Sequence, residues 1–279
     1  MSLSIIAIIL SAALLHAVWN AIVKTAVDRT TTLGLVALGH VIPGAIMVTV
    51  LPLPSAQSAI YIVLSTLVHF AYFYFLGRAY QQGDLSVVYP IARGIVPVLV
   101  SLWAWLLLGE TLPALVWIGI GFIISGIVLS SWKAFSSGLE KSALLLSLAT
   151  GFCISFYSLA DGVGVRLSGN TLSYWAWGAF LHLFIAGFIG WRKRVTFKQL
   201  PLKVWVIGIM GGIVSMTAYG LVLYAKNFAD LGVVSALRET SVIFATMIGF
   251  FILKEGNWKR RFSAAILMIF GIAILGLNA

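Results

Sequence analysis

Charged side chains that lie deep inside apolar stretches are the residues of this 279-residue chain best suited to chemistry. Three of them, Arg93, Arg238 and Glu239, are surrounded by long runs of hydrophobic residues. An ionised group inside a bilayer costs about 2.5–3.5 kcal/mol, so it faces a protein interior or an aqueous cavity. Two interpretations stay open. Either the arginines bind a carboxylate or phosphate of a ligand, or one of them forms a structural ion pair with Glu239.

A second polar group lies along the first apolar stretch, where His16 and Asn20 are four residues apart and Trp19 lies beside them. Residues four apart share a helix face, and a polar stripe in an apolar helix is expected to face inward. We therefore predict that Trp19 and Asn20 contact a ligand. Histidine titrates near neutral pH, so His16, like Glu239, is a candidate for proton coupling. The alternative for His16 is a packed, hydrogen-bonded histidine.

Aromatic residues deep in other apolar stretches can bind a flat or apolar ligand by stacking and by burial of surface. Packing in the core or against lipid is the alternative for each of them taken singly. The residues that we predict to line a cavity with the arginines are Tyr72, Tyr89, Tyr157 and Tyr219.

Two prolines, Pro90 and Pro97, flank Arg93 and predict a kink, because proline removes a backbone donor from the helix. The related run from Arg238 to Ser241 sweeps the whole helix circumference with polar residues and leaves no face for lipid. This ninth stretch is therefore expected to be enclosed by other helices or locally unwound. Asp161, near the end of the sixth stretch, is expected at the outer interface.

The elements that position these residues are long apolar helices. The chain is 61% hydrophobic and only 9% charged, whereas soluble domains carry about 25% charged residues, so a soluble enzyme is excluded. Stretches of about 17–25 apolar residues can cross a bilayer as helices. The sequence predicts ten of them, over residues 3–23, 33–51, 58–77, 85–108, 113–131, 142–160, 171–190, 203–223, 232–253 and 262–278.

Basic residues set the expected orientation, because lysine and arginine accumulate in cytoplasmic loops. Only Arg166 and Lys226 follow even-numbered stretches. Both termini are therefore predicted to be periplasmic. The residues that follow odd-numbered stretches are Lys24, Arg29, Arg78, Lys133, Lys141, Arg192, Lys193, Arg194, Lys198, Lys203, Lys254, Lys259, Arg260 and Arg261.

An internal repeat is visible in the charged positions. Arg93 aligns with Arg238, and Glu110 with Glu255, both at an offset of 145 residues. The sequence therefore predicts two halves, residues 1–135 and 142–279, joined by a linker at 136–141. Each half holds five stretches, and an odd number inverts the second half relative to the first. Inverted repeats are typical of transporters that open alternately to the two sides of a membrane.

The block Gly-Asp-Leu-Ser-Val-Val-Tyr-Pro-Ile-Ala-Arg-Gly-Ile-Val-Pro at 83–97 and the Leu-Gly-Glu turn at 108–110 resemble the EamA type of the drug/metabolite transporter superfamily. The resemblance covers essentially the whole chain. It implies a ten-helix carrier, similar to YddG-like exporters of amino acids, aromatic ones among them, or of related metabolites.

We therefore expect an all-α membrane protein with ten transmembrane helices in two inverted repeats, working as a secondary transporter in the bacterial inner membrane. The alternatives are an organic phosphate or phosphonate antiporter and, more remotely, a non-transporting scaffold or a lipid-acting enzyme. No nucleotide-binding, metal-binding or nucleophile motif appears, so no enzyme activity, metal or cofactor is expected. The expected partners are a small-molecule substrate and the lipid bilayer, with no nucleic acid, for a monomer or weak homo-oligomer.

Overall fold

The computed structural model describes residues 1–24, 26, 28–82, 85–130, 132, 140–251 and 258–278, and every regular element in this part of the chain is a helix. In lipid, a helix satisfies its own backbone hydrogen bonds, which explains why apolar stretches of this length become helices. The first half holds α1 (Leu3–Lys24), α2 (Arg29–Val50), α3 (Ala56–Gln82), α4 (Leu85–Gly94), α5 (Val96–Leu108) and α6 (Ala114–Ser130). The second half holds α8 (Lys141–Leu167), α9 (Thr171–Arg192), α10 (Arg194–Gln199), α11 (Leu202–Ala225), α12 (Leu231–Arg238), α13 (Ser241–Phe251) and α14 (Trp258–Asn278).

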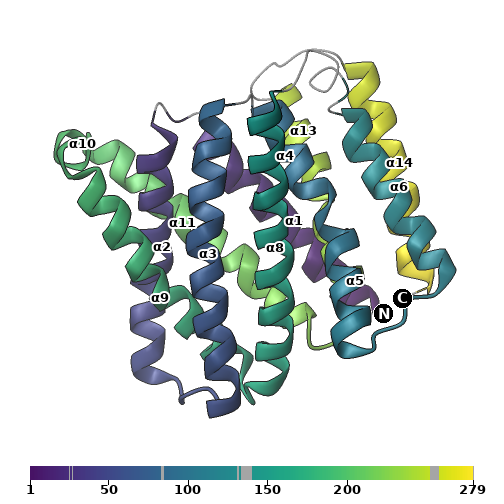
Figure 1. Cartoon of the computed structure of the whole chain (residues 1–279), viewed down its shortest axis with the longest axis horizontal. Coiled ribbons are helices and arrows are strands. Elements are labelled where there is room, and N and C mark those ends of the chain that lie inside the picture. The colour runs from purple at the N-terminus through teal and green to yellow at the C-terminus, as the bar shows by residue number, and fades with distance from the viewer. Residues whose placement is uncertain are drawn as a thin grey trace.

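Seven helical segments of the described chain are long and apolar enough to cross a membrane, and two shorter apolar ones lie in α6 and α14. The tenth crossing is made by α12 and α13, which together match the predicted ninth stretch. The helices run side by side with their connections at two opposite ends, and both chain termini lie at the same end (Figure 1). This confirms the predicted all-α fold of ten crossings.

The most extensive packing joins the two halves of the chain. Helix α3 lies against α8, α1 against α11, α2 against α9, and α6 against α14. In the repeat, α1 corresponds to α8 and α3 to α11. The contact of α3 with α8 and that of α1 with α11 are therefore equivalent under the repeat. The contacts of α2 with α9 and of α6 with α14 each join a helix to its own equivalent in the other half. This is the arrangement that a two-fold repeat requires.

A close glycine contact sets the distance between α2 and α11. A Cβ atom added to Gly39 would lie 2.3 Å from the Ile209 carbonyl oxygen, and one added to Gly212 would lie 2.2 Å from that of Val36. Both are below any real contact distance, so only glycine allows the two backbones to approach this closely. The contact fixes α11, which carries Tyr219, against the first half.

Helix α8 ends at Leu167, well beyond residue 160, where the sequence placed the end of the sixth stretch. The extension moves Asp161 from the expected outer interface to the interior, and only 3% of its surface is exposed. The interface prediction for Asp161 was therefore wrong. It failed because the polar residues after position 160 lie on a helix that other helices cover.

Candidate functional site

Two crossings are interrupted at equivalent positions of the repeat. Helix α4 ends at Gly94 and α5 begins at Val96, while α12 ends at Arg238 and α13 begins at Ser241. In the first half, Pro97 lies in the first turn of α5 and cannot donate to the carbonyl four residues earlier. The backbone stays helical through Pro90, so the interruption falls at Ile95, two residues before Pro97; the side chains of Pro90 and Tyr89 lie outside the described part.

The second interruption is made without proline. The amides of Glu239 and Thr240 donate to the carbonyls of Ala236 and Leu237, each 3.1 Å away and three residues earlier. These tight turns replace the regular helix bonds. Every residue from Leu231 to Val242 is buried, so the ninth crossing is both enclosed and interrupted. Broken helices inside a membrane protein are typical of substrate and ion sites.

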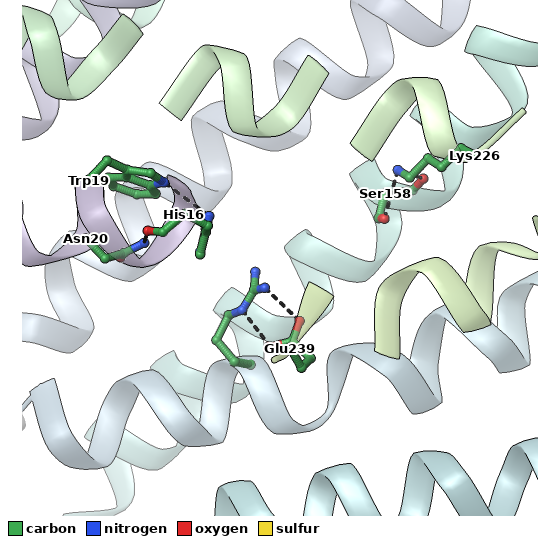
Figure 2. A network of polar contacts seen from close by, with 7 residues as sticks. His16, Trp19, Asn20, Ser158, Lys226 and Glu239 are labelled. Carbon is green, nitrogen blue, oxygen red and sulfur yellow. Dashed lines mark hydrogen bonds and ion pairs between the residues drawn. The ribbon is translucent and has the colours of Figure 1, made fainter. Parts of the chain in front are cut away.

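Arg93 forms a buried ion pair with Glu239 across the interface of the two halves. Its Nε lies 2.9 Å from Oε2, and its Nη2 lies 2.7 Å from Oε1. The two side chains are 4% and 0% exposed. Figure 2 marks the contacts that reach Glu239 as dashed lines. Of the two interpretations for these charges, the structure contains the ion pair. The charge of Arg93 is therefore balanced without a ligand.

Arg238 has different surroundings. Its guanidinium lies over the ring of Tyr219, 5.3 Å from the centroid, and it also interacts with the Tyr157 hydroxyl. Within the described residues, Arg238 takes part in no ion pair, although it is only 7% exposed. The buried hydroxyls of Thr240 and Ser241, which follow it in the chain, have no hydrogen-bond partner. A guanidinium beside unsatisfied hydroxyls can bind an anionic oxygen group.

The polar stripe of α1 is bonded mainly to itself. The indole of Trp19 donates to His16 Nδ1 at 3.1 Å, and the amide of Asn20 donates to the His16 carbonyl at 2.7 Å. Trp19 also packs in an apolar cluster with Val23 and Leu33. Since an indole only donates, His16 Nδ1 carries a lone pair and the imidazole is neutral with its proton on Nε2.

Three of the predicted aromatic residues lie together. The ring centroid of Tyr157 lies 5.9 Å from that of Tyr72 and 6.1 Å from that of Tyr219. These rings come from α8, α3 and α11, and they surround His69, whose ring stacks on Tyr157 at 3.9 Å. The fold thus forms an aromatic cluster next to Arg238.

Sequence reasoning missed a polar cavity beside this cluster. About 30 Å³ of it is open to the centre of a water molecule, which is room for one or two waters. Asp161 accepts hydrogen bonds there from Tyr174, at 2.9 Å, and from Tyr219. The other polar residues that line it are His40, Ser65, Thr66, His69 and His182. The sequence marks each of these histidines singly, because each lies within an apolar stretch, but it does not show that they meet.

The two basic residues that follow even-numbered stretches both have partners within the protein, Lys226 as a buried side chain and Arg166 as an exposed one. Lys226 is 1% exposed, and its ammonium donates to the Ser158 carbonyl at 2.8 Å and hydroxyl at 3.0 Å (Figure 2). Arg166 pairs with Glu110 at 2.6 Å. Neither is a free loop charge.

Comparison with known proteins agrees with this architecture. The model of the EamA-like transporter family matches residues 3–132 and 141–277. An uncharacterized protein of Schizosaccharomyces pombe is 23% identical over 218 residues, which are 66% of this chain and 64% of that protein, so the match spans less than two thirds of that relative.

One crystal structure of a protein superposes with a TM-score of 0.78 at 19% identity, covering 99% of both chains, and this likeness concerns the fold alone. The family match extends over nearly the whole chain in two copies. This chain therefore belongs to the EamA-like transporter family and is a multi-pass membrane protein.

Proposed function

We propose that this protein is a secondary transporter that exports amino acids, aromatic ones among them, or related carboxylates across the bacterial inner membrane. The observation that carries the proposal is the environment of Arg238. It is a buried cation with no ion-pair partner among the described residues, and it lies between Tyr219 and the hydroxyls of Thr240 and Ser241. In this proposal Arg238 binds the carboxylate, and the cluster of Tyr72, Tyr157 and Tyr219 binds the side chain of the substrate.

The balance of charge favours a carboxylate over a phosphate or phosphonate. Two unpaired arginines would suit a dianion, but Glu239 neutralises Arg93. One positive charge, that of Arg238, is then left at the two helix interruptions. A single arginine matches a monoanionic head group, because the other cation beside Tyr219, Lys226, is already bonded to Ser158.

Alternating access is the proposed mechanism, with residues 1–135 and 142–279 as the two moving halves and 136–141 as their linker. Support comes from the extensive contacts between equivalent helices of the halves and from the interruption of both central crossings. The proposed site is formed within one chain, so a monomer suffices. Arg166 and Lys226 have partners within the protein, Glu110 and Ser158, so the excess of basic residues at the other end supports periplasmic termini.

Transport by the purified protein in liposomes tests the proposal. We expect uptake of labelled tryptophan, phenylalanine or leucine above that of empty vesicles, and no uptake of a sugar phosphate or a phosphonate. Arg238→Gln should lower uptake at least tenfold, because the carboxylate loses its cation, whereas Arg238→Lys should retain part of it. The matched control is Arg192→Gln, which removes an exposed arginine at the end of α9.

Three outcomes would contradict the proposal. Uptake of the phosphates alone would favour the antiporter. Uptake of amino acids that is indifferent to Arg238→Gln would remove the binding site. No flux with any substrate, from a protein whose melting temperature no ligand raises, would favour a scaffold.

A further inference from the structure

Three histidines from three different helices meet at the cavity next to Asp161. The rings of His40 in α2 and His182 in α9 stack with their centroids 4.6 Å apart. The ring of His69 in α3 lies 5.3 Å from that of His182, edge to face. All three line the cavity. The transport site proposed above uses none of them.

Hydrogen bonds fix the tautomer of two of these histidines. Nδ1 of His69 lies 2.8 Å from the Ser65 carbonyl, and Nδ1 of His182 lies 2.9 Å from the Gly178 carbonyl. A carbonyl oxygen only accepts, so each Nδ1 carries the hydrogen. In a neutral imidazole the other nitrogen, Nε2, then holds a lone pair. Both side chains therefore keep a proton-accepting atom.

Asp161 supplies the opposite charge in the same cavity. Its Oδ1 accepts from the Tyr174 hydroxyl and its Oδ2 from the Tyr219 hydroxyl, and Ser65 also interacts with it. A positive imidazolium nearby would be compensated by this carboxylate, whereas an isolated buried charge would be very unfavourable.

Tyr219 connects this cavity to the arginine site. Its hydroxyl donates to Asp161, and its ring lies beneath the guanidinium of Arg238 and 5.6 Å from the Lys226 ammonium. A change in the charge around Asp161 therefore acts on the residue that supports Arg238. One side chain provides a physical connection between the two sites.

We propose that His69 and His182, with Asp161 as counter-charge and His40 stacked against them, form the proton-binding site that couples transport to the proton gradient. The proposal rests on the proposed transport function. A proton from water adds to the Nε2 lone pair of one imidazole, gives an imidazolium, and leaves to water on the other side when the transporter changes state. No bond to the substrate changes. The titratable or charged groups that surround the site are His40, His69, Tyr157, Asp161, Tyr174, His182, Tyr219, Lys226 and Arg238.

The geometry favours a proton over a metal ion. Within the described residues, no group of three or more histidine, cysteine or carboxylate side chains is placed to hold a metal. One nitrogen of His69 and one of His182 already form hydrogen bonds to backbone carbonyls. Both oxygens of Asp161 already accept hydrogen bonds from tyrosine hydroxyls. His16 is a weaker candidate, because its Nδ1 already accepts a hydrogen bond from the Trp19 indole.

The first experiment needs no substrate. Histidine ring signals of the ¹³C-labelled protein in nanodiscs are followed by NMR between pH 4 and 8. We expect a titrating signal that disappears in His69→Gln or His182→Gln and shifts in Asp161→Asn. The control is Cys153→Ala, which alters the single cysteine, two helical turns from Asp161 on α8, and should leave the titration unchanged. Absence of any titrating signal from His69 and His182 would overturn the proposal.

The second experiment measures coupling in liposomes that contain pyranine, a pH-sensitive dye. An imposed amino acid gradient should change the internal pH with wild-type protein. His69→Gln, His182→Gln and Asp161→Asn should each reduce the pH change per substrate transported at least tenfold while exchange of labelled for unlabelled substrate continues. Flux without a pH change in the wild type would overturn the coupling. Titration that depends on Asp161, in a protein that transports no substrate, would support the proton site and reject the transport function.

Discussion

Arg93 in α4 binds both carboxylate oxygens of Glu239, the first residue after α12, through its Nε and Nη2 atoms at 2.9 and 2.7 Å. The two residues are 146 positions apart and belong to different halves of the repeat. The pair therefore joins the interrupted crossing of one half to that of the other, with both charges out of contact with solvent.

Removing one member of this pair should destabilise the protein strongly. Arg93→Met leaves a buried carboxylate without its counter-charge, and Glu239→Gln leaves a buried guanidinium, each of which costs about 3–5 kcal/mol. Melting temperatures in detergent, followed by intrinsic tryptophan fluorescence, should fall in both variants. The double variant Arg93→Met/Glu239→Met should recover most of the loss, because it buries no charge. A double variant as unstable as the sum of the two single ones would contradict this account.

Glu110 and Arg166 should stabilise the connection between α11 and α12 at one end of the bundle. Arg166 pairs with Glu110 at 2.6 Å and also donates to the carbonyls of Lys226 and Ala229, while the amide of Leu231 donates to Glu110 at 3.0 Å. A hydrogen bond to a charged group contributes about 1.5–3 kcal/mol, so Glu110→Gln should speed amide exchange at Leu231 about tenfold or more.

Hydrogen exchange read by mass spectrometry over peptides that cover 226–232 measures this change. The matched control is Glu140→Gln, an exposed carboxylate before α8, which should leave those peptides unchanged. Equal exchange in the Glu110 variant and the wild type would show that the segment between α11 and α12 keeps its structure without this ion pair.

Asp28 should make stability depend on pH. Burial alone would raise the pKa of its carboxyl, but hydrogen bonds from Thr31 and the ammonium of Lys193, 3.1 Å away, together lower that pKa. A carboxyl with a lowered pKa stabilises the folded state above its unfolded pKa of about 3.9, and this contribution is lost as the pH falls through the folded value.

Asp28→Asn keeps the helix cap and removes the charge. It should therefore lower the free energy of unfolding by about 0–1 kcal/mol at pH 6, since the pair is partly exposed, and by progressively less as the pH falls below about 4. Melting temperatures of the wild type and variant between pH 3 and 7 measure this difference. A difference that stays constant over the whole range would show that the charge of Asp28 contributes nothing.

The sequence predicted those features that depend on one helix at a time. The lengths of the apolar stretches predicted the ten crossings. The polar run from Arg238 to Ser241 predicted that the ninth crossing is enclosed or unwound, and in the structure it is both buried and interrupted. Spacing along one helix cannot show which side chains meet across helices. The sequence therefore left two interpretations open, a ligand bound by the arginines or an ion pair between Glu239 and one of them.

The cavity lined by the three histidines could not be predicted from the sequence for the same reason. His40, His69 and His182 come from three helices and share no motif, so nothing in the sequence brings them together. Asp161 was assigned to the interface because the polar residues after position 160 suggested the end of a helix. Burial by neighbouring helices, which decides its environment, is a tertiary property.

The offset that aligns Arg93 with Arg238 also aligns Gly94 with Glu239, so only the second half carries the acid. A duplicated carrier with identical halves would have two end states of equal energy, related by exchange of the halves. Here the acid pairs with one arginine and not with the other, so such end states differ in energy. On the proposed mechanism, we expect this protein to have a preferred resting orientation, to which the carboxylate of Glu239 contributes.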